Sequence, residues 1–187
     1  MNDMNKQDLL KNGIDLITEF CKINNINIPT IKNSKTKYSG YYTYGSNTIH
    51  INLDNCRIPQ INPIRSWSFP GYFVDRTPIG VITHEFGHYL HEILGFPKMG
   101  RIGLHITNYE PNYYERFAET IKLFLTNPDL LKEYNIKRYN FLTQKLKLVP
   151  VKTTDWKTTL YDYVTPSEKY INACNNRIIN GQKTNNK

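Results

Sequence analysis

The stretch from Thr77 to Gly95 constrains the fold most, because it contains the pattern H-E-x-x-H with His84, Glu85 and His88 at its fixed positions. Histidines four residues apart lie one turn apart on the same face of a helix, so their imidazoles can bind one metal ion. Glu85 then lies beside the open coordination position, where a water molecule binds. We therefore expect a helix built around a catalytic metal rather than two incidental histidines on a solvated helix.

The ends of this helix are marked in the sequence. Thr77 is a suitable N-cap, Pro78 suits the first helical position, and Gly95 supplies the stop. Apolar residues recur along it at helical spacing: Ile82, Phe86, Tyr89, Leu90 and Ile93. The motif helix is therefore predicted to pack into a core.

Length and composition predict one domain. The chain has 187 residues, of which 39% are hydrophobic, enough for a single core. We expect an α+β domain over residues 1–187. Residues 1–76 would form an N-terminal helix, a hairpin and an aromatic loop, residues 77–126 the metal-binding helices, and residues 127–187 a mostly helical C-terminal part.

The remaining composition bears on location and partners. No apolar run is long enough to span a membrane, and the N-terminus lacks the apolar segment of a secretory signal. We therefore expect a cytoplasmic protein without a membrane partner, or a secreted one if the chain is a processed form. Cys21, Cys56 and Cys174 form no C-x-x-C pair and are expected to be free thiols. The net charge of +8 comes from lysines dispersed along the chain, so a biased amino-acid composition explains it better than a nucleic-acid-binding surface does. Nucleic acid is therefore the weaker alternative as a partner.

The N-terminal part contains the signals of a helix and a hairpin. Residues 3–24 have apolar positions at helical spacing, and residues 38–44 and 47–53 are predicted strands joined through a Gly-Ser turn. The second strand alternates, with the apolar side chains on the core face: Ile49, Ile51 and Leu53. His50 and Asn52 then lie on the opposite face, where His50 is an exposed strand residue and not a ligand.

Further along the chain, residues 54–76 are rich in proline and aromatic residues and predict a long loop. This loop either borders a substrate cleft or packs its aromatic side chains onto the scaffold. Helices are expected over residues 111–125, within 128–148, and over a short final segment, 166–178.

Two histidines need a third protein ligand to complete a catalytic zinc site. The candidates are His91, His105, Glu110, Glu115 and Glu119. The metzincin class is excluded, because it requires glycine and histidine where this chain has His91 and Leu94. One further turn along the same helix, His91 would reach poorly around a tetrahedral ion, so we expect it beside the ligands or on the surface.

Glu115 and Glu119 lie one turn apart on one face of a separate helix, and they can therefore act together across the site. We expect Glu115 to be the third ligand. A zinc-bound histidine commonly donates its second ring N–H to a carboxylate, and this is the role expected of Glu119.

The motif of His84 to His88, followed by Glu115-Arg116-Phe117-Ala118-Glu119, resembles the gluzincin metallopeptidases related to the anthrax lethal factor catalytic domain, whose second motif has the form E-x-F-A-E. The resemblance covers about residues 77–130. It implies a zincin-like metallopeptidase domain, with a small antiparallel sheet, an active-site helix and a mostly helical C-terminal part.

The same resemblance implies a zinc-dependent endopeptidase that binds one catalytic Zn²⁺ and acts on a protein or peptide substrate. Glu85 would be its general base. In that family a tyrosine shortly before the glutamate ligand helps to stabilise the transition state. Tyr109 is the nearest match here, and Tyr113 and Tyr114 are the alternatives.

Two neighbouring families and a non-enzyme role are the alternatives. The ImmA/IrrE-type proteases resemble residues 84–90 but carry their glutamate where this chain has Asn112. The SprT-type proteases, which are associated with DNA, use a third histidine, and His105 lies at nearly the right distance. A non-catalytic structural or binding protein of a phage or mobile element could keep a zincin fold, but it has no use for Glu85.

By analogy with zincins, the substrate is expected to lie extended beside an edge strand of the sheet, where backbone hydrogen bonds hold it. The expected edge strand is the segment 47–53.

Overall fold

The computed structural model describes residues 5–57, 76–100, 102, 106–107 and 109–152. Its elements in chain order are α1 (Lys6–Ile23), β1 (Thr30–Asn33), β2 (Gly40–Thr43), β3 (Thr48–Ile51), a 3₁₀ turn η1 (Leu53–Asn55), α2 (Pro78–Ile93), α3 (Tyr113–Thr126), α4 (Pro128–Tyr134), α5 (Ile136–Asn140) and a π-helical turn η3 (Phe141–Lys145). This is an α+β arrangement, as predicted.

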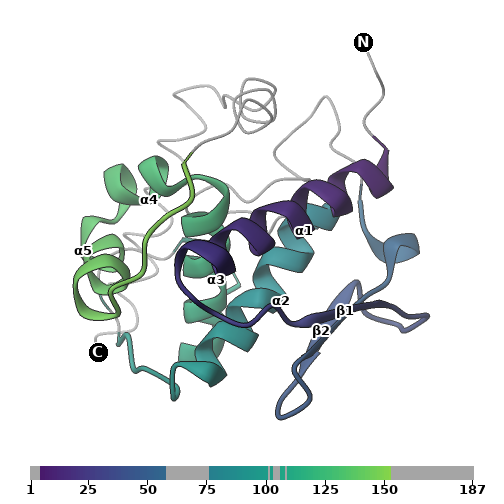
Figure 1. The fold of residues 1–187 in the computed structure, drawn as a ribbon, viewed down its shortest axis with the longest axis horizontal. Coiled ribbons are helices and arrows are strands. Elements are labelled where there is room, and N and C mark those ends of the chain that lie inside the picture. Colours follow the sequence, from purple (N-terminus) through teal and green to yellow (C-terminus); the bar gives the residue numbers. More distant parts are fainter. Residues whose placement is uncertain (1–4, 58–75, 101, 103–105, 108, 153–187) are drawn as a thin grey trace.

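Helices α1, α2 and α3 lie together at the centre, with the sheet beside α2 and with α4 and α5 at the other end (Figure 1). Phe20 of α1 contacts Phe86 of α2 and Phe124 of α3 edge to face, with ring centroids 5.8 and 6.3 Å apart. All three side chains are fully buried. The core therefore lies between the three helices. The apolar face of α2 packs into it as the spacing predicted, except at Ile93 near the end of the helix, which is 41% exposed.

Helices α2 and α3 approach each other closely at Gly87. A Cβ atom added to this glycine would lie 2.6 Å from the Cα atom of Ala118, which is too near for any side chain. The small residue in the middle of the H-E-x-x-H motif therefore sets the distance between the two helices.

The sheet is mixed rather than antiparallel, which corrects the expectation. β2 and β3 form the predicted antiparallel hairpin, but β1 joins β3 in parallel and the strand order is β1-β3-β2. β3 is therefore the central strand, and the expectation that segment 47–53 is an edge strand was wrong. The edge strand that lies against the motif helix is β2.

The alternation of β3 is confirmed for its core face, because Ile49 and Ile51 are buried. His50 is half-buried and stacks on Tyr41, with ring centroids 4.4 Å apart. Asn52, expected on the outer face, is buried instead. Its side chain accepts the N–H of Asp54 and donates to a backbone carbonyl, because it caps the 3₁₀ turn η1.

Several predictions fall on other parts of the chain. Four of them lie outside the described residues: most of the aromatic loop 54–76, His105, Cys174 and the helix predicted over 166–178. Cys21 and Cys56 are buried free thiols, as expected. Among the described helices, none has the length and apolar character needed to cross a membrane.

Candidate metal centre

Helix α2 carries three of the candidate site residues. The Thr77 hydroxyl accepts the backbone N–H of Gly80 and caps the helix, as predicted. One turn apart on the face toward Glu115, His84 and His88 are each only 9% exposed, and Glu85 is half-buried. Their Nε2 atoms lie 3.2 Å apart, so both imidazoles point to one place.

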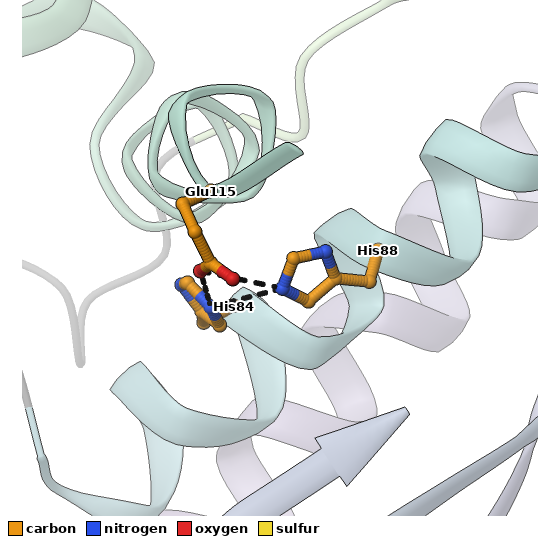
Figure 2. Close-up of side chains that lie close together, drawn as sticks. All are labelled: His84, His88 and Glu115. Carbon is orange, nitrogen blue, oxygen red and sulfur yellow. Dashed lines mark hydrogen bonds and ion pairs between the residues drawn. The ribbon is translucent and has the colours of Figure 1, made fainter. Parts of the chain in front are cut away.

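Helix α3 supplies Glu115 from its first turn. The Asn112 side chain accepts the backbone N–H groups of Tyr114 and Glu115 at 2.9 and 3.0 Å, which fixes the start of the helix. From there the Glu115 side chain extends across to α2 and its carboxylate lies between the two histidines (Figure 2). Glu115 Oε2 lies 3.1 Å from His84 Nε2 and 3.5 Å from His88 Nε2.

The three ligand atoms fit a tetrahedral metal ion. Zinc–nitrogen and zinc–oxygen bonds of about 2.0–2.1 Å place neighbouring ligand atoms about 3.3 Å apart. The three separations in the structure, 3.1, 3.2 and 3.5 Å, form a triangle of this size. Moreover, Glu115 Oε2 is buried and accepts no regular hydrogen bond within the described residues, so it is available as a ligand. The residues present therefore fit a metal with three protein ligands.

Glu119 orients the His84 ring from the side opposite to the candidate metal position. Its Oε1 accepts a hydrogen bond from His84 Nδ1 at 2.6 Å, which leaves Nε2 of that ring free for a metal. Its Oε2 accepts from the Thr107 hydroxyl and from the Lys122 ammonium, the latter at 2.6 Å. Burial alone would raise the pKa of the Glu119 carboxyl, but the Lys122 charge and the His84 hydrogen bond lower it to about 2. Glu119 is therefore a fixed anion.

The centre as a whole is an electronegative pocket that attracts cations. Burial opposes charge on His84, but the adjacent carboxylates of Glu115 and Glu119 raise the pKa of its imidazole. Burial likewise opposes charge on Glu115, and the two histidines lower the pKa of its carboxyl to about 2. The carboxylates that favour the protonated form of His84 would attract a divalent cation in the same way, and the cation would take the place of the imidazole proton.

Glu85 has the environment of a base. Burial raises the pKa of its carboxyl, and the nearby His84 and His88 oppose that rise. It also accepts a hydrogen bond from the backbone N–H of Tyr42 on the edge strand β2. A carboxylate with a raised pKa holds a proton more readily than an ordinary one, as a general base needs to do.

Replacing Glu119 with glutamine should weaken zinc binding by about 10–100-fold, as is typical when the partner of a ligating histidine is lost. The substitution leaves Lys122 without its carboxylate and the His84 ring less firmly held. Competition with a zinc chelator measures the affinity. Glu19→Gln, at an exposed position of α1, is the matched control and should bind zinc as the wild type does. Equal affinity of the two variants would contradict this role for Glu119.

The tyrosine candidates separate clearly in space. Tyr109 lines the cleft beside the motif, with its ring centroid 5.8 Å from that of His84, and it is 46% exposed. Burial raises the pKa of its hydroxyl, and Glu115 and Glu85 raise it further, so it stays protonated. Tyr113 and Tyr114 pack instead around His91, with ring centroids 5.8 and 5.5 Å away. The geometry favours Tyr109.

Two other candidate ligands have different roles. His91 is fully buried, stacks on Phe117 with ring centroids 4.4 Å apart, and its Nε2 lies 3.2 Å from the Pro97 carbonyl oxygen. It is part of the packing rather than a surface residue. Glu110 is buried in an ion pair with Arg138, and its Oε1 also accepts the backbone N–H of Ile106. It supports the loop before α3.

Sequence reasoning missed several contributors to the centre. Lys122 follows Glu119 by three residues on the same helix. Opposite charges at this spacing commonly pair, so the sequence could have predicted the contact. Thr107 and the backbone N–H of Tyr42 come from a loop and a strand edge, and no local pattern marks them. Tyr44 at the hairpin tip lies near His88, with ring centroids 6.5 Å apart, through tertiary packing alone.

A cleft opens in front of the centre. One hollow of about 280 Å³ is bounded by β2 on one side and by the motif residues, Tyr109 and Glu115 on the other. The Glu115 side chain is 19% exposed, so the ligand cluster is reached from this cleft. The arrangement therefore offers a metal position, a base and an edge strand around one space.

No family model, curated protein or solved structure matches this chain.

Proposed function

We propose that the protein is a zinc-dependent endopeptidase of the gluzincin type, with a zincin-like fold and His84, His88 and Glu115 as ligands of one Zn²⁺. The triangle of the three ligand atoms, which opens into a cleft, is the observation that carries the proposal. A structural zinc site closes its fourth position with protein, whereas the described residues offer three ligands, with Glu85 beside them.

Bound zinc would lower the pKa of a coordinated water to about 7 and polarise the scissile carbonyl. Glu85 takes the proton of the attacking water and passes it to the leaving amine. Its half-buried position and its hydrogen bond to the Tyr42 backbone hold the carboxylate at the floor of the cleft. Glu119 keeps the His84 ring oriented throughout.

Tyr109 is the proposed donor to the oxyanion. Its hydroxyl stays protonated because burial and nearby carboxylates raise its pKa. Its backbone N–H donates to the Thr107 hydroxyl oxygen, and Thr107 in turn contacts Glu119, so the loop and the ligand cluster are joined. Loss of one such donor typically lowers a rate by on the order of a hundredfold.

The substrate would lie extended along β2. In an antiparallel pair, the backbone groups of alternate residues point away from the partner strand. Asn52 donates to the Ser39 carbonyl on the β3 side, so Gly40 and Tyr42 have their backbone groups on the cleft side. The outward N–H of Tyr42 already meets Glu85. The other outward groups have no backbone partner among the described residues, and a peptide strand could pair with them.

The gluzincin ligand set is favoured over the SprT-type set, which would use His105. Glu115 Oε2 lies 3.1 Å from His84 Nε2 and 3.5 Å from His88 Nε2, close enough for the three atoms to bind one ion. His105 lies outside the described residues. A non-catalytic binding protein is disfavoured by the open cleft and by Glu85.

Metal analysis together with cleavage of a mixed peptide library tests the proposal. The wild-type protein should contain one zinc per chain and cleave a subset of peptides. Removal of the metal with a chelator should abolish cleavage, and added zinc should restore it. Zinc without cleavage of any peptide, with or without added DNA, would favour the binding role, and absence of bound metal after zinc addition would overturn the proposal.

A further inference from the structure

The cleft in front of the metal centre has two chemically different ends. A second hollow, of about 320 Å³, adjoins the first and shares Tyr38, Gly40, His84, Glu85 and Tyr109 with it. Beyond these shared residues the second hollow is lined by Lys37 and Arg76, whereas the first is lined by His88 and Tyr44. One cleft therefore runs from a cationic end to an aromatic end across the proposed catalytic residues.

The cationic end consists of Lys37 and Arg76. Both side chains are exposed, and no ion pair joins either of them to an acid in the described part of the chain. Arg76 lines the second hollow together with Lys37 and Tyr109, so its charge is close to the cleft. Two cations that meet no acid among the described residues, at the end of the proposed substrate cleft, match an anionic group on the ligand.

The aromatic end of the cleft is lined by Tyr44, and the rings of Phe96 and Tyr114 pack against that of Tyr44 to form a cluster of three. Their ring centroids lie 5.8, 6.4 and 6.2 Å apart, and Tyr44 also contacts the ligand His88. The cluster remains open to solvent, because Tyr44 is 49% and Phe96 39% exposed. A partly exposed aromatic cluster beside a catalytic centre can bury a large apolar side chain of a substrate.

The aromatic cluster is held in place by specific contacts. The Glu92 carboxylate accepts hydrogen bonds from the backbone N–H of Gly45 at 2.9 Å and from the Tyr42 hydroxyl at 2.6 Å, which fixes the hairpin tip on α2. Phe96 has a φ of 55°, a left-handed conformation that a bulky residue rarely adopts. This conformation closes the C-terminal end of α2, where the backbone N–H of Phe96 donates to the His91 carbonyl at 2.8 Å, and it fixes the position of the Phe96 ring.

The direction of β2 relates the two ends to the direction of a bound peptide. Gly40, at the start of β2, lies against Val81 and Glu85, and Gly45, just after its end, lies against Glu92. β2 therefore runs from the cationic end to the aromatic end. A peptide added antiparallel to β2, the slightly more stable pairing, runs the other way. Its N-terminal half then meets the aromatic cluster and its C-terminal half meets Lys37 and Arg76.

We propose that the preferred substrates carry a large apolar or aromatic side chain on the N-terminal side of the scissile bond and an acidic side chain on its C-terminal side. This inference rests on the proposed peptidase function, and it names the substrate class of the same cleft.

Binding and cleavage of matched peptides test this inference. Four peptides would place phenylalanine or alanine on the N-terminal side and aspartate or lysine on the C-terminal side. Their affinities are measured by fluorescence anisotropy on zinc-loaded Glu85→Gln protein, and kcat/KM on zinc-loaded wild type. We expect the phenylalanine–aspartate peptide to be favoured, with aspartate preferred over lysine by about tenfold, the effect of two exposed charge pairs.

Variants at each end assign the preferences. Lys37→Glu combined with Arg76→Glu should reverse the preference between aspartate and lysine and leave that between phenylalanine and alanine unchanged. Tyr44→Ser should remove the preference for phenylalanine over alanine and leave that for aspartate over lysine unchanged. Lys32→Glu changes an exposed lysine on β1, at the far edge of the sheet, and should change neither preference.

Binding and cleavage distinguish the two proposals. Selective binding without cleavage would overturn the peptidase function and leave the two ends of the cleft assigned. Cleavage or binding without these preferences, or with the two sides exchanged, would overturn the inference alone.

Discussion

Glu85→Gln protein should bind zinc as the wild type does and cleave peptides about 10²–10⁴ times more slowly, the usual contribution of a general base. Glutamine has nearly the same shape as glutamate, and its carbonyl oxygen can still accept the Tyr42 N–H, but it cannot take a proton. The three ligand side chains are unchanged in this variant. The loss should therefore appear in kcat rather than in metal content.

Turnover of the best library peptide and zinc content, measured on the same preparations, check this prediction. Glu19→Gln is again the control, because it removes the same charge from an exposed position of α1. A Glu85→Gln protein that keeps wild-type turnover would remove Glu85 from the mechanism. Loss of zinc in that variant would mean that Glu85 acts through the metal site instead.

Arg138→Met should lower the free energy of unfolding by about 3–5 kcal/mol, the usual effect of removing one partner of a buried ion pair. Both side chains of the pair are fully buried, and the Arg138 guanidinium donates to Glu110 at 3.0 and 2.8 Å. It also donates to Thr120 and to the carbonyl of residue 102, so it joins α5, α3 and the loop before α3. Methionine fills similar space without these hydrogen bonds.

Urea unfolding of the zinc-free protein measures this effect, since bound metal would add its own stability to the folded state. The double variant Glu110→Gln with Arg138→Met should be more stable than Arg138→Met alone, because it also removes the carboxylate that has lost its closest cation. A single variant within about 1 kcal/mol of wild type would contradict the buried-pair argument.

Local rules predicted the parts of the site that lie on helices. The cap at Thr77, the four-residue spacing of the histidines and the pairing of Glu115 with Glu119 all follow from helix geometry, and the structure has them together. The sheet was predicted in part. Its hairpin follows from a turn and an alternating strand, whereas the parallel strand β1 pairs across a longer stretch of chain and carries no local signal.

The sequence also did not predict which charged side chains are buried. Lysine and arginine usually lie on the surface, yet Lys122 and Arg138 are almost fully buried. Each forms an ion pair with a buried carboxylate, Lys122 with Glu119 of the site and Arg138 with Glu110 of the loop before α3. Only the tertiary fold brings Arg138 to Glu110. The loop that carries Tyr109 is therefore supported by a residue that sequence spacing does not connect to it.

Gly87 lies between the two histidines of the motif and touches Ala118, which lies between the two glutamates of the other helix. These two small residues therefore set the spacing of the proposed metal centre, and the contact between the two backbones determines the distance between the His84, His88 and Glu115 ligand atoms. A change in metal preference in such a protein need not begin at a ligand. It can begin with one methyl group at this crossing, which would move an entire helix with its carboxylates away from the imidazoles.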